Sequence, residues 1–137
     1  DVRAVISVNK GLVTQASAAI PVVPLYFAIL YKVMKKAGNH ENCIQQIARL
    51  FTQKLYTPEG FRTDENGFIR MDDYELLPEI QEEVKKCWKA VTTDTVNEYC
   101  DIDGYWEDFY HMFGFHYEDI DYTQDVDADV EIDGIVM

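Results

Sequence analysis

The sequence predicts an α/β fold that is mostly helical, with one buried strand and one small β-hairpin. Three patterns carry this prediction. Residues 2–8 form a nearly continuous apolar run, apolar side chains recur at helical spacing within 16–55 and 78–113, and Asn66-Gly67 separates two short runs of strand-forming residues. A chain of 137 residues with 47% hydrophobic content is long enough to bury one modest core.

The run at 2–8 is rich in Val and Ile, which is typical of a strand covered on both faces of a parallel sheet. Gly11 and its neighbours end this run, and 14–17 supply hydroxyl side chains that can cap a helix. We therefore expect a strand at 2–8 followed by a loop at 9–15. Open α/β sheets bind ligands at such loops, although an ordinary capped helix start fits the same residues.

The segment 16–55 predicts two helices. The first, at about 16–37, tolerates its two prolines only in the opening turns or at a kink, and Gly38 ends it. Asn39 is the expected cap of the second helix, at about 40–55. The apolar side chains of this second helix recur at helical spacing and are expected to face inward: Ile44, Ile47, Phe51 and Leu55.

The second half of the chain is expected to begin with a surface hairpin at 61–71, because Asn-Gly is the strongest two-residue signal for a tight β-turn. Helical spacing then predicts C-terminal helices at 78–91 and 103–113. Residues 101–137 hold 12 of the 25 acidic residues and no Lys or Arg. The stretch 114–137 is therefore expected to be a solvated acidic tail.

Charge and cysteine content exclude several classes of partner and location. A net charge of -13 repels phosphate backbones, so nucleic acid is excluded as a main partner. The apolar run 18–31 is 14 residues long and contains two prolines, which is too short for a membrane span. Three widely spaced cysteines favour a reducing, cytoplasmic setting. Because the sequence does not begin with Met, we expect a fragment or a processed piece.

No catalytic or metal motif is complete in this sequence. The seven glycines form neither GxGxxG nor a P-loop, and the histidines have no cysteine at metal-ligand spacing. Tyr31 and Lys35 have the spacing of a reductase proton donor and its lysine, but lysines beside a negative helix end have an ordinary explanation. The alternating carboxylates of 125–133 lack the final Glu of an EF-hand, which favours a solvated tail.

Five long stretches match a known family in order along nearly the whole chain. They are KGLVTQASAAIPVVPLY at 10–26, YKVMKKAGNHENCIQQIARLF at 31–51, IRMDDYEL at 69–76, GYWEDFYHMFGF at 104–115 and DYTQDVDADV at 121–130. In these stretches the chain closely resembles the trans-2-enoyl-CoA reductases, the family that also contains the FabV class of enoyl-[acyl-carrier-protein] reductases.

The resemblance implies that the chain is the C-terminal part of a single reductase domain with a short-chain-dehydrogenase-like Rossmann fold. The glycine-rich loop and the catalytic Tyr-x8-Lys pair of the family are expected upstream of Asp1, so this chain alone is expected to be inactive. The resemblance assigns cofactor binding to Gly11, Leu12, Val13 and Thr14. It assigns the acyl chain to lid helices within 16–55 and to the side chains of Val23, Phe27, Tyr31 and Tyr105.

The resemblance also implies the reaction. The expected enzyme is a cytoplasmic monomer that uses NADH, with NADPH as the alternative, to saturate the C2=C3 bond of an enoyl-CoA or enoyl-ACP in fatty acid synthesis. Lys32, Lys35 and Lys36 either meet coenzyme A phosphates or form a solvated helix end. A non-catalytic acidic helical module that binds a protein partner or Ca²⁺ remains the alternative function.

Overall fold

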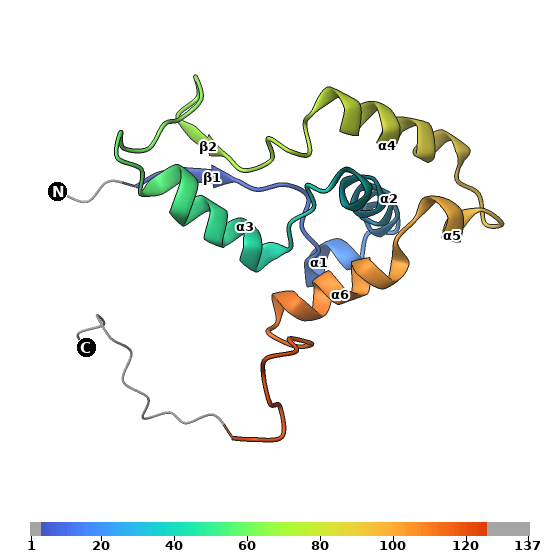
Figure 1. Cartoon of the computed structure of the whole chain (residues 1–137). Coiled ribbons are helices and arrows are strands. Elements are labelled where there is room, and N and C mark those ends of the chain that lie inside the picture. Colours follow the sequence, from blue (N-terminus) through green and yellow to red (C-terminus); the bar gives the residue numbers. More distant parts are fainter. Residues whose placement is uncertain (1–3, 126–137) are drawn as a thin grey trace.

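The computed structural model describes residues 4–125 and places a small sheet beside a cluster of helices (Figure 1). The strands β1 (Ile6–Val8) and β2 (Phe68–Arg70) pair in parallel, with Ile6 opposite Phe68. Ile6 is 60% exposed. Residues 4–125 supply only one neighbouring strand, so a strand covered on both faces stays a prediction for a longer protein.

The hairpin predicted at 61–71 is wrong, although the turn inside it exists. The Asp64 side chain accepts hydrogen bonds from the amides of Asn66 (2.9 Å) and Phe68 (3.0 Å), and Gly67 has a φ of 82°. The strand after this turn forms its parallel ladder with β1, and its backbone bond across the turn is the Asp64 amide donating to the Phe68 carbonyl at 2.8 Å. The Asp64 carboxylate thus satisfies the turn amides without a partner strand.

The first predicted helix is divided in two. The short helix α1 (Gln15–Ala18) is capped by Thr14, and α2 (Val22–Ala37) follows after a turn with Pro21 at its N-cap. Both prolines of this segment therefore lie at the start of α2, where a backbone amide has no helical acceptor to lose. Gly38 ends α2 with a φ of 76°, as predicted.

The second predicted helix begins later than expected. It starts as α3 (Cys43–Arg49), and its N-cap is Asn42 rather than Asn39. The Asn42 side chain accepts the Gln45 amide at 2.9 Å, which forms one half of a capping box. The helix then widens into the π-helical segment η1 (Leu50–Leu55).

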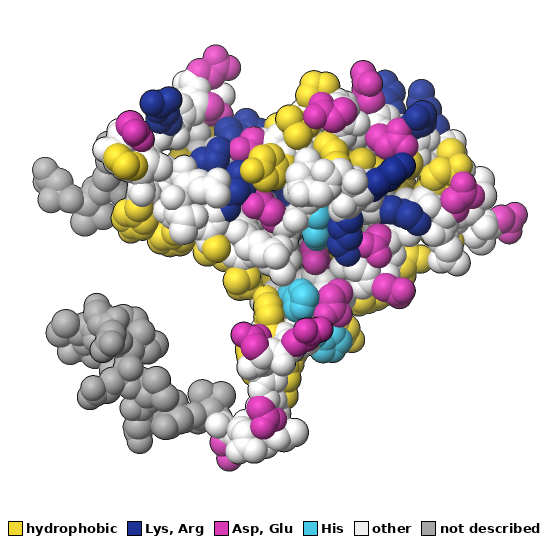
Figure 2. All heavy atoms as spheres, viewed as in Figure 1, with side chains coloured by type: hydrophobic (Ala, Val, Ile, Leu, Met, Phe, Trp, Pro, Cys, Tyr) yellow, Lys and Arg dark blue, Asp and Glu magenta, His cyan; other side chains and the backbone are white. Residues whose placement is uncertain are grey.

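The apolar stripe of α3 and η1 faces outward, which contradicts the prediction. Ile44, Ile47 and Phe51 are 50%, 45% and 45% exposed, whereas Gln46 and Arg49 on the other face are buried. Figure 2 shows hydrophobic side chains along the lower edge of the molecule, beside β1 and α3. Helical spacing identified the stripe, but polar partners of Arg49 decide which face turns toward the rest of residues 4–125.

The remaining helices surround α2 (Figure 1). They are α4 (Pro78–Ala90), the short α5 (Val96–Tyr99), which the sequence did not predict, and α6 (Ile102–Met112). Helix α2 packs against both α4 and α6. The core that results contains Ile29, Leu30, Tyr31, Met34, Ile80, Val84 and Tyr105. Across residues 4–125 no helix has the length and apolar content to span a bilayer.

Candidate functional site

The loop after β1 is held most firmly at Gly11. The Gly11 amide donates to Oε2 of Glu75 at 2.6 Å, and its carbonyl accepts the Tyr31 hydroxyl at 3.3 Å. The Lys10 ammonium donates to the same carbonyl at 3.3 Å. Both polar groups of this residue are therefore bound by side chains of the protein itself.

The Phe27 ring covers the remaining side of Gly11. A Cβ atom at this position would lie 2.5 Å from Cε1 of Phe27, which is closer than van der Waals contact allows. The Phe27 ring in turn stacks on Tyr31, with ring centroids 6.1 Å apart and planes inclined by 3°. The structure thus brings the predicted cofactor loop together with two of the predicted acyl-contact residues.

Further along the loop the backbone is only partly occupied. Leu12 is half-exposed, and within residues 4–125 its amide donates to no acceptor. Val13 is 3% exposed and belongs to the core. The Thr14 hydroxyl and amide are both engaged with Ser17, at 3.1 and 2.8 Å, in the capping box of α1. The Leu12 amide is therefore an unpaired donor that this loop can offer to a ligand.

The other two predicted acyl-contact residues lie elsewhere. Tyr105 is 4% exposed on α6 and lines a separate apolar cavity of about 260 Å³ with Ala28 and Trp106. Its hydroxyl is buried and makes no hydrogen bond with residues 4–125. Val23 is half-buried near the start of α2. The structure therefore joins Phe27 and Tyr31 to the loop but does not gather all four side chains in one cavity.

Tyr31 and Lys35 do not form a proton-donating pair. Burial raises the pKa of the Tyr31 hydroxyl, and the Asp108 carboxylate raises it further. A tyrosine that acts as an acid near neutral pH needs the opposite shift. Lys35 pairs with Asp101 at 2.6 Å, and Lys32 donates to the Asn97 carbonyl at 2.9 Å. These two lysines therefore connect α2 to the residues around α5. The sequence analysis had expected them either to bind coenzyme A phosphates or to form a solvated helix end.

A buried polar cluster beside Tyr31 was missed by the sequence analysis. His40 Nε2 and Asp108 Oδ2 are 3.0 Å apart, and both side chains are 10% exposed. The His40 ring packs edge-on against Tyr31, with centroids 4.6 Å apart, and the Lys10 ammonium lies 4.6 Å from the centre of the Tyr31 ring. Asp108 is a charged residue within the aromatic-rich sequence of α6, which is the one sequence signal for this cluster.

Lys10 is a buried cation, with only 3% of its surface exposed. Burial lowers the pKa of Lys10 to about 8, although the charges of Asp108 and Glu75 act in the opposite direction. The ordinary pKa of 10.5 applies to the unfolded chain. The unfolded state therefore binds more protons between pH 8 and pH 10.5, so the contribution of this group to stability rises with pH across that range.

Replacing Lys10 with Met removes this pH dependence. The free energy of unfolding of Lys10→Met is expected to exceed that of the wild type by the largest amount near pH 7. This excess is expected to fall by about 2–3 kcal/mol as the pH rises to 10. Urea unfolding of both proteins at several pH values measures the difference. Lys85→Met is the matched control, because Lys85 is exposed. If the stability difference between Lys10→Met and the wild type changed as little with pH as that of Lys85→Met, the buried charge would be contradicted.

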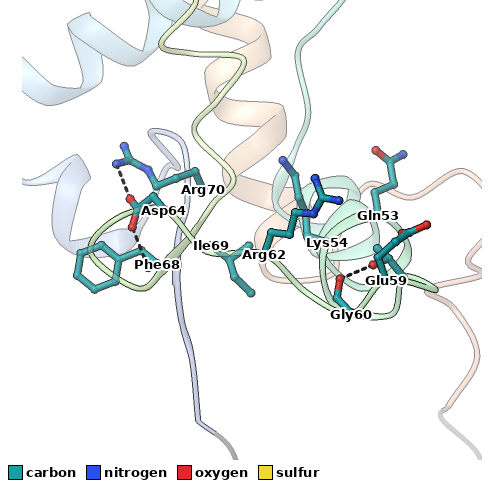
Figure 3. Close-up of a pocket in the computed structure, with 10 residues that line it drawn as sticks. Gln53, Lys54, Glu59, Gly60, Arg62, Asp64, Phe68, Ile69 and Arg70 are labelled. Carbon is teal, nitrogen blue, oxygen red and sulfur yellow. Dashed lines mark hydrogen bonds and ion pairs between the residues drawn. The ribbon is translucent and has the colours of Figure 1, made fainter.

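A polar hollow of about 550 Å³ lies beside β2 and η1 (Figure 3). Two of its three cations are engaged within the protein, since Lys54 pairs with Asp73 at 2.8 Å and Arg70 pairs with Asp64 and Asp72, whereas exposed Arg62 forms no ion pair with residues 4–125. None of the residues that line it belongs to the loop at 9–15. We therefore place the candidate site at the loop rather than in this hollow.

Among residues 4–125, no cluster of three or more metal-binding side chains occurs. His111 and His116 each pair with Glu107, at 3.2 and 3.0 Å. The alternating carboxylates after Asp125 lie outside the described residues. All three cysteines are free thiols.

Comparison with known proteins identifies the family. Residues 1–56 match the family model described as "Trans-2-enoyl-CoA reductase catalytic region", and residues 63–126 match "Enoyl reductase FAD binding domain". The chain is 48% identical over 134 residues to an enoyl-[acyl-carrier-protein] reductase [NADH] of Flavobacterium psychrophilum, covering 98% of this chain and 34% of that protein. The chain belongs to the trans-2-enoyl-CoA reductase family.

Other members of the trans-2-enoyl-CoA reductase family give the same result. A trans-2-enoyl-CoA reductase [NADH] of Ruminiclostridium cellulolyticum is 48% identical, over 97% of this chain and 33% of that protein. The crystal structure of Treponema denticola trans-2-enoyl-CoA reductase in complex with NAD superposes with a TM-score of 0.78 at 49% identity, over 90% of this chain and 31% of that one. The chain thus spans about a third of the length of the relatives it matches.

The residues that match the FAD-named model do not fit a flavin dinucleotide. Residues 63–125 carry eighteen Asp and Glu against four Lys and Arg, a balance that repels a pyrophosphate. Within the described chain, the link from β2 to α4 contains no glycine with which a backbone could approach a phosphate. Gly104 lies inside α6, with Lys35 and Asp101 filling the space beside it.

Proposed function

We propose that this chain is the cofactor-loop and lid portion of an NADH-dependent enoyl thioester reductase. The observation that carries the proposal is a match over 97–98% of this chain, at 48–50% identity. The matched proteins are named enoyl-[acyl-carrier-protein] reductase [NADH] and trans-2-enoyl-CoA reductase [NADH]. The geometry supports it, because the loop at 9–15 follows the carboxyl end of a parallel strand and offers a free amide.

The exposed apolar faces support a place within a longer protein. A two-stranded parallel pair does not stand alone in water, since parallel strands are normally covered on both faces. Ile6 on β1 and the stripe at Ile44, Ile47 and Phe51 leave apolar surface uncovered. Figure 2 shows hydrophobic side chains on the surface beside β1 and α3. We infer that the rest of a Rossmann sheet packs here, with β1 as one of its inner strands and the catalytic Tyr-x8-Lys pair outside this chain.

Within such an enzyme the chain positions the cofactor. Bound NADH supplies the hydride that reaches the β-carbon of the enoyl thioester. The Leu12 amide, with the adjoining Val13 and Thr14, holds the nicotinamide end so that one face of the ring meets the substrate. Gly11 sets the direction of that amide, because its own amide and carbonyl are fixed by side chains.

The acyl chain then lies along α2. Phe27 and Tyr31 present stacked rings next to the loop, and an apolar wall there excludes water from the reacting carbon. Tyr105 faces α2 from α6, and Val23 lies in the first turn of α2 itself. In the proposed complex both come into contact with longer acyl chains. The thioester is carried by coenzyme A or by acyl carrier protein.

Turnover of the full-length protein tests this function. The full-length enzyme is expected to oxidise NADH, measured by its absorbance, when crotonyl-CoA is added, whereas residues 1–137 alone are expected to show no turnover. Turnover by the isolated chain would contradict the placement of the catalytic pair outside it. Failure of the full-length protein to oxidise NADH with any enoyl thioester would contradict the function itself.

A further inference from the structure

Glu75 lies far from the loop in sequence but touches it in space. It belongs to the link 71–77 between β2 and α4, within the region that matches the FAD-named family model. We propose that Glu75 is a positioning residue for NADH, which acts by fixing Gly11 and thereby the direction of the Leu12 amide. This assignment rests on the proposed function.

The Glu75 carboxylate is held at both oxygens. Oε2 accepts the Gly11 amide at 2.6 Å, and Oε1 accepts the Tyr26 hydroxyl at 2.9 Å. The backbone of Glu75 is fixed as well, because Gln81 on α4 donates its side-chain amide to the Glu75 carbonyl at 2.7 Å. The carboxylate therefore reaches the loop from a support that includes both α2 and α4.

The charges around this contact favour a phenol that donates to the carboxylate. The charges of Glu75 and Asp108 act on the buried Lys10 ammonium. Burial, with the charge of Glu75 as the second cause, raises the pKa of Tyr26 to about 12, so the phenol keeps its proton near neutral pH. A hydrogen bond from a backbone amide to a carboxylate is about twice as strong as one between neutral groups.

The consequence for the cofactor follows from the geometry of one peptide segment. Glu75 holds the Gly11 amide, while Tyr31 and Lys10 hold the Gly11 carbonyl, which is part of the peptide plane that carries the Leu12 amide. Without Glu75 the first of these restraints is lost and the Leu12 amide can turn away from its ligand. Through the hydrogen bond of Glu75 to Gly11, the region 63–126 thus contributes to nicotinamide binding by holding the loop in position.

The test uses the full-length enzyme and compares Glu75→Ala, Glu75→Gln and the control Glu79→Ala. Glu79 lies nearby on α4, is exposed, and its side chain makes no hydrogen bond with residues 4–125. Glu75→Ala is expected to raise the KM for NADH about 10–100-fold while the KM for crotonyl-CoA changes less than about 2-fold. Glu75→Gln keeps one acceptor and is expected to limit the rise to about 3–10-fold.

A second measurement keeps the assignment falsifiable if Glu75→Ala does not fold. Hydrogen exchange of the peptide that contains 9–15 is measured in the enzyme without NADH, and Glu75→Gln is expected to exchange there at least about 3-fold faster than wild type, with Glu79→Ala unchanged. Equal NADH KM and equal exchange in Glu75→Gln and Glu79→Ala would overturn the assignment. A wild-type enzyme that neither binds nor oxidises NADH would overturn the proposed function together with it.

Discussion

Replacing Arg49 with methionine is expected to lower the free energy of unfolding by about 3–5 kcal/mol, the largest stability effect of any single substitution considered for this chain. Arg49 is 6% exposed and binds Glu41 at 2.7 Å and Asp73 at 2.9 Å. Its guanidinium also donates to the Met71 carbonyl at 2.9 Å and lies 4.2 Å from the centre of the Tyr74 ring. Methionine fills similar space but leaves the Glu41 carboxylate without a cation and Asp73 with Lys54 alone.

Chemical denaturation of the full-length protein measures this effect. Lys86→Met is the matched control, because Lys86 pairs with Glu83 at 2.9 Å while its side chain is 76% exposed. The control is expected to change stability by less than about 0.5 kcal/mol, as exposed ion pairs do. If Arg49→Met and Lys86→Met cost the same, the Arg49 cluster does not hold α3 to the segment after β2.

Gly11→Ala is expected to raise the KM for NADH by about 10-fold or more and to cost about 1–3 kcal/mol of stability. The effect comes from contact alone, since Gly11 is not among the glycines with positive φ. The new Cβ would lie 2.5 Å from Cε1 of Phe27, and stacking on Tyr31 restricts how far that ring can move. Either the ring or the loop must shift, and both lie in the proposed site.

A second substitution shows whether the contact is the cause. Phe27→Leu removes the ring atom that meets the new Cβ, so Gly11→Ala combined with Phe27→Leu is expected to recover part of both losses. Steady-state kinetics with NADH and thermal unfolding of the four proteins complete the cycle. Strictly additive effects would mean that the Phe27 ring does not confine Gly11.

Local signals in the sequence were sufficient for several elements. Pro78 opens α4, Gly38 ends α2 and Gly114 follows the last turn of α6, because each residue type suits one backbone position regardless of its surroundings. The loop after β1 was predicted for the same reason. The resemblance to the reductase family added the assignment of that loop to the cofactor. The residue spacing alone fitted a ligand-binding loop and an ordinary capped helix start equally well.

The errors arise where distant residues decide the outcome. The Asn66-Gly67 turn was found, but its strand pairs with β1, and no local pattern encodes a partner from the other half of the chain. The spacing of Ile47 and its neighbours defined a helix face without saying which way it points. That choice depends on Arg49 reaching Asp73 and on whatever covers the exposed stripe.

The polar side chains at the site were the hardest to predict. Lys10 and Glu75 have no motif, and their charges give no sign that one is buried and the other touches a loop amide. His40 matches no metal-binding pattern in the sequence, and its contact with Asp108 depends on the packing of α6 against α2. Such contacts form only when three separate segments meet.

We propose above that this chain supplies the nicotinamide-side loop and the acyl-contact helix of a larger reductase. A crystal structure of the full-length protein with NADH and an enoyl thioester tests it most directly. The Leu12 amide is expected within about 2.7–3.2 Å of the nicotinamide carboxamide oxygen, with Phe27 within about 4.5 Å of acyl carbons. A nicotinamide that contacts none of 11–14, or an acyl chain bound on the Ile44 stripe instead, would contradict it.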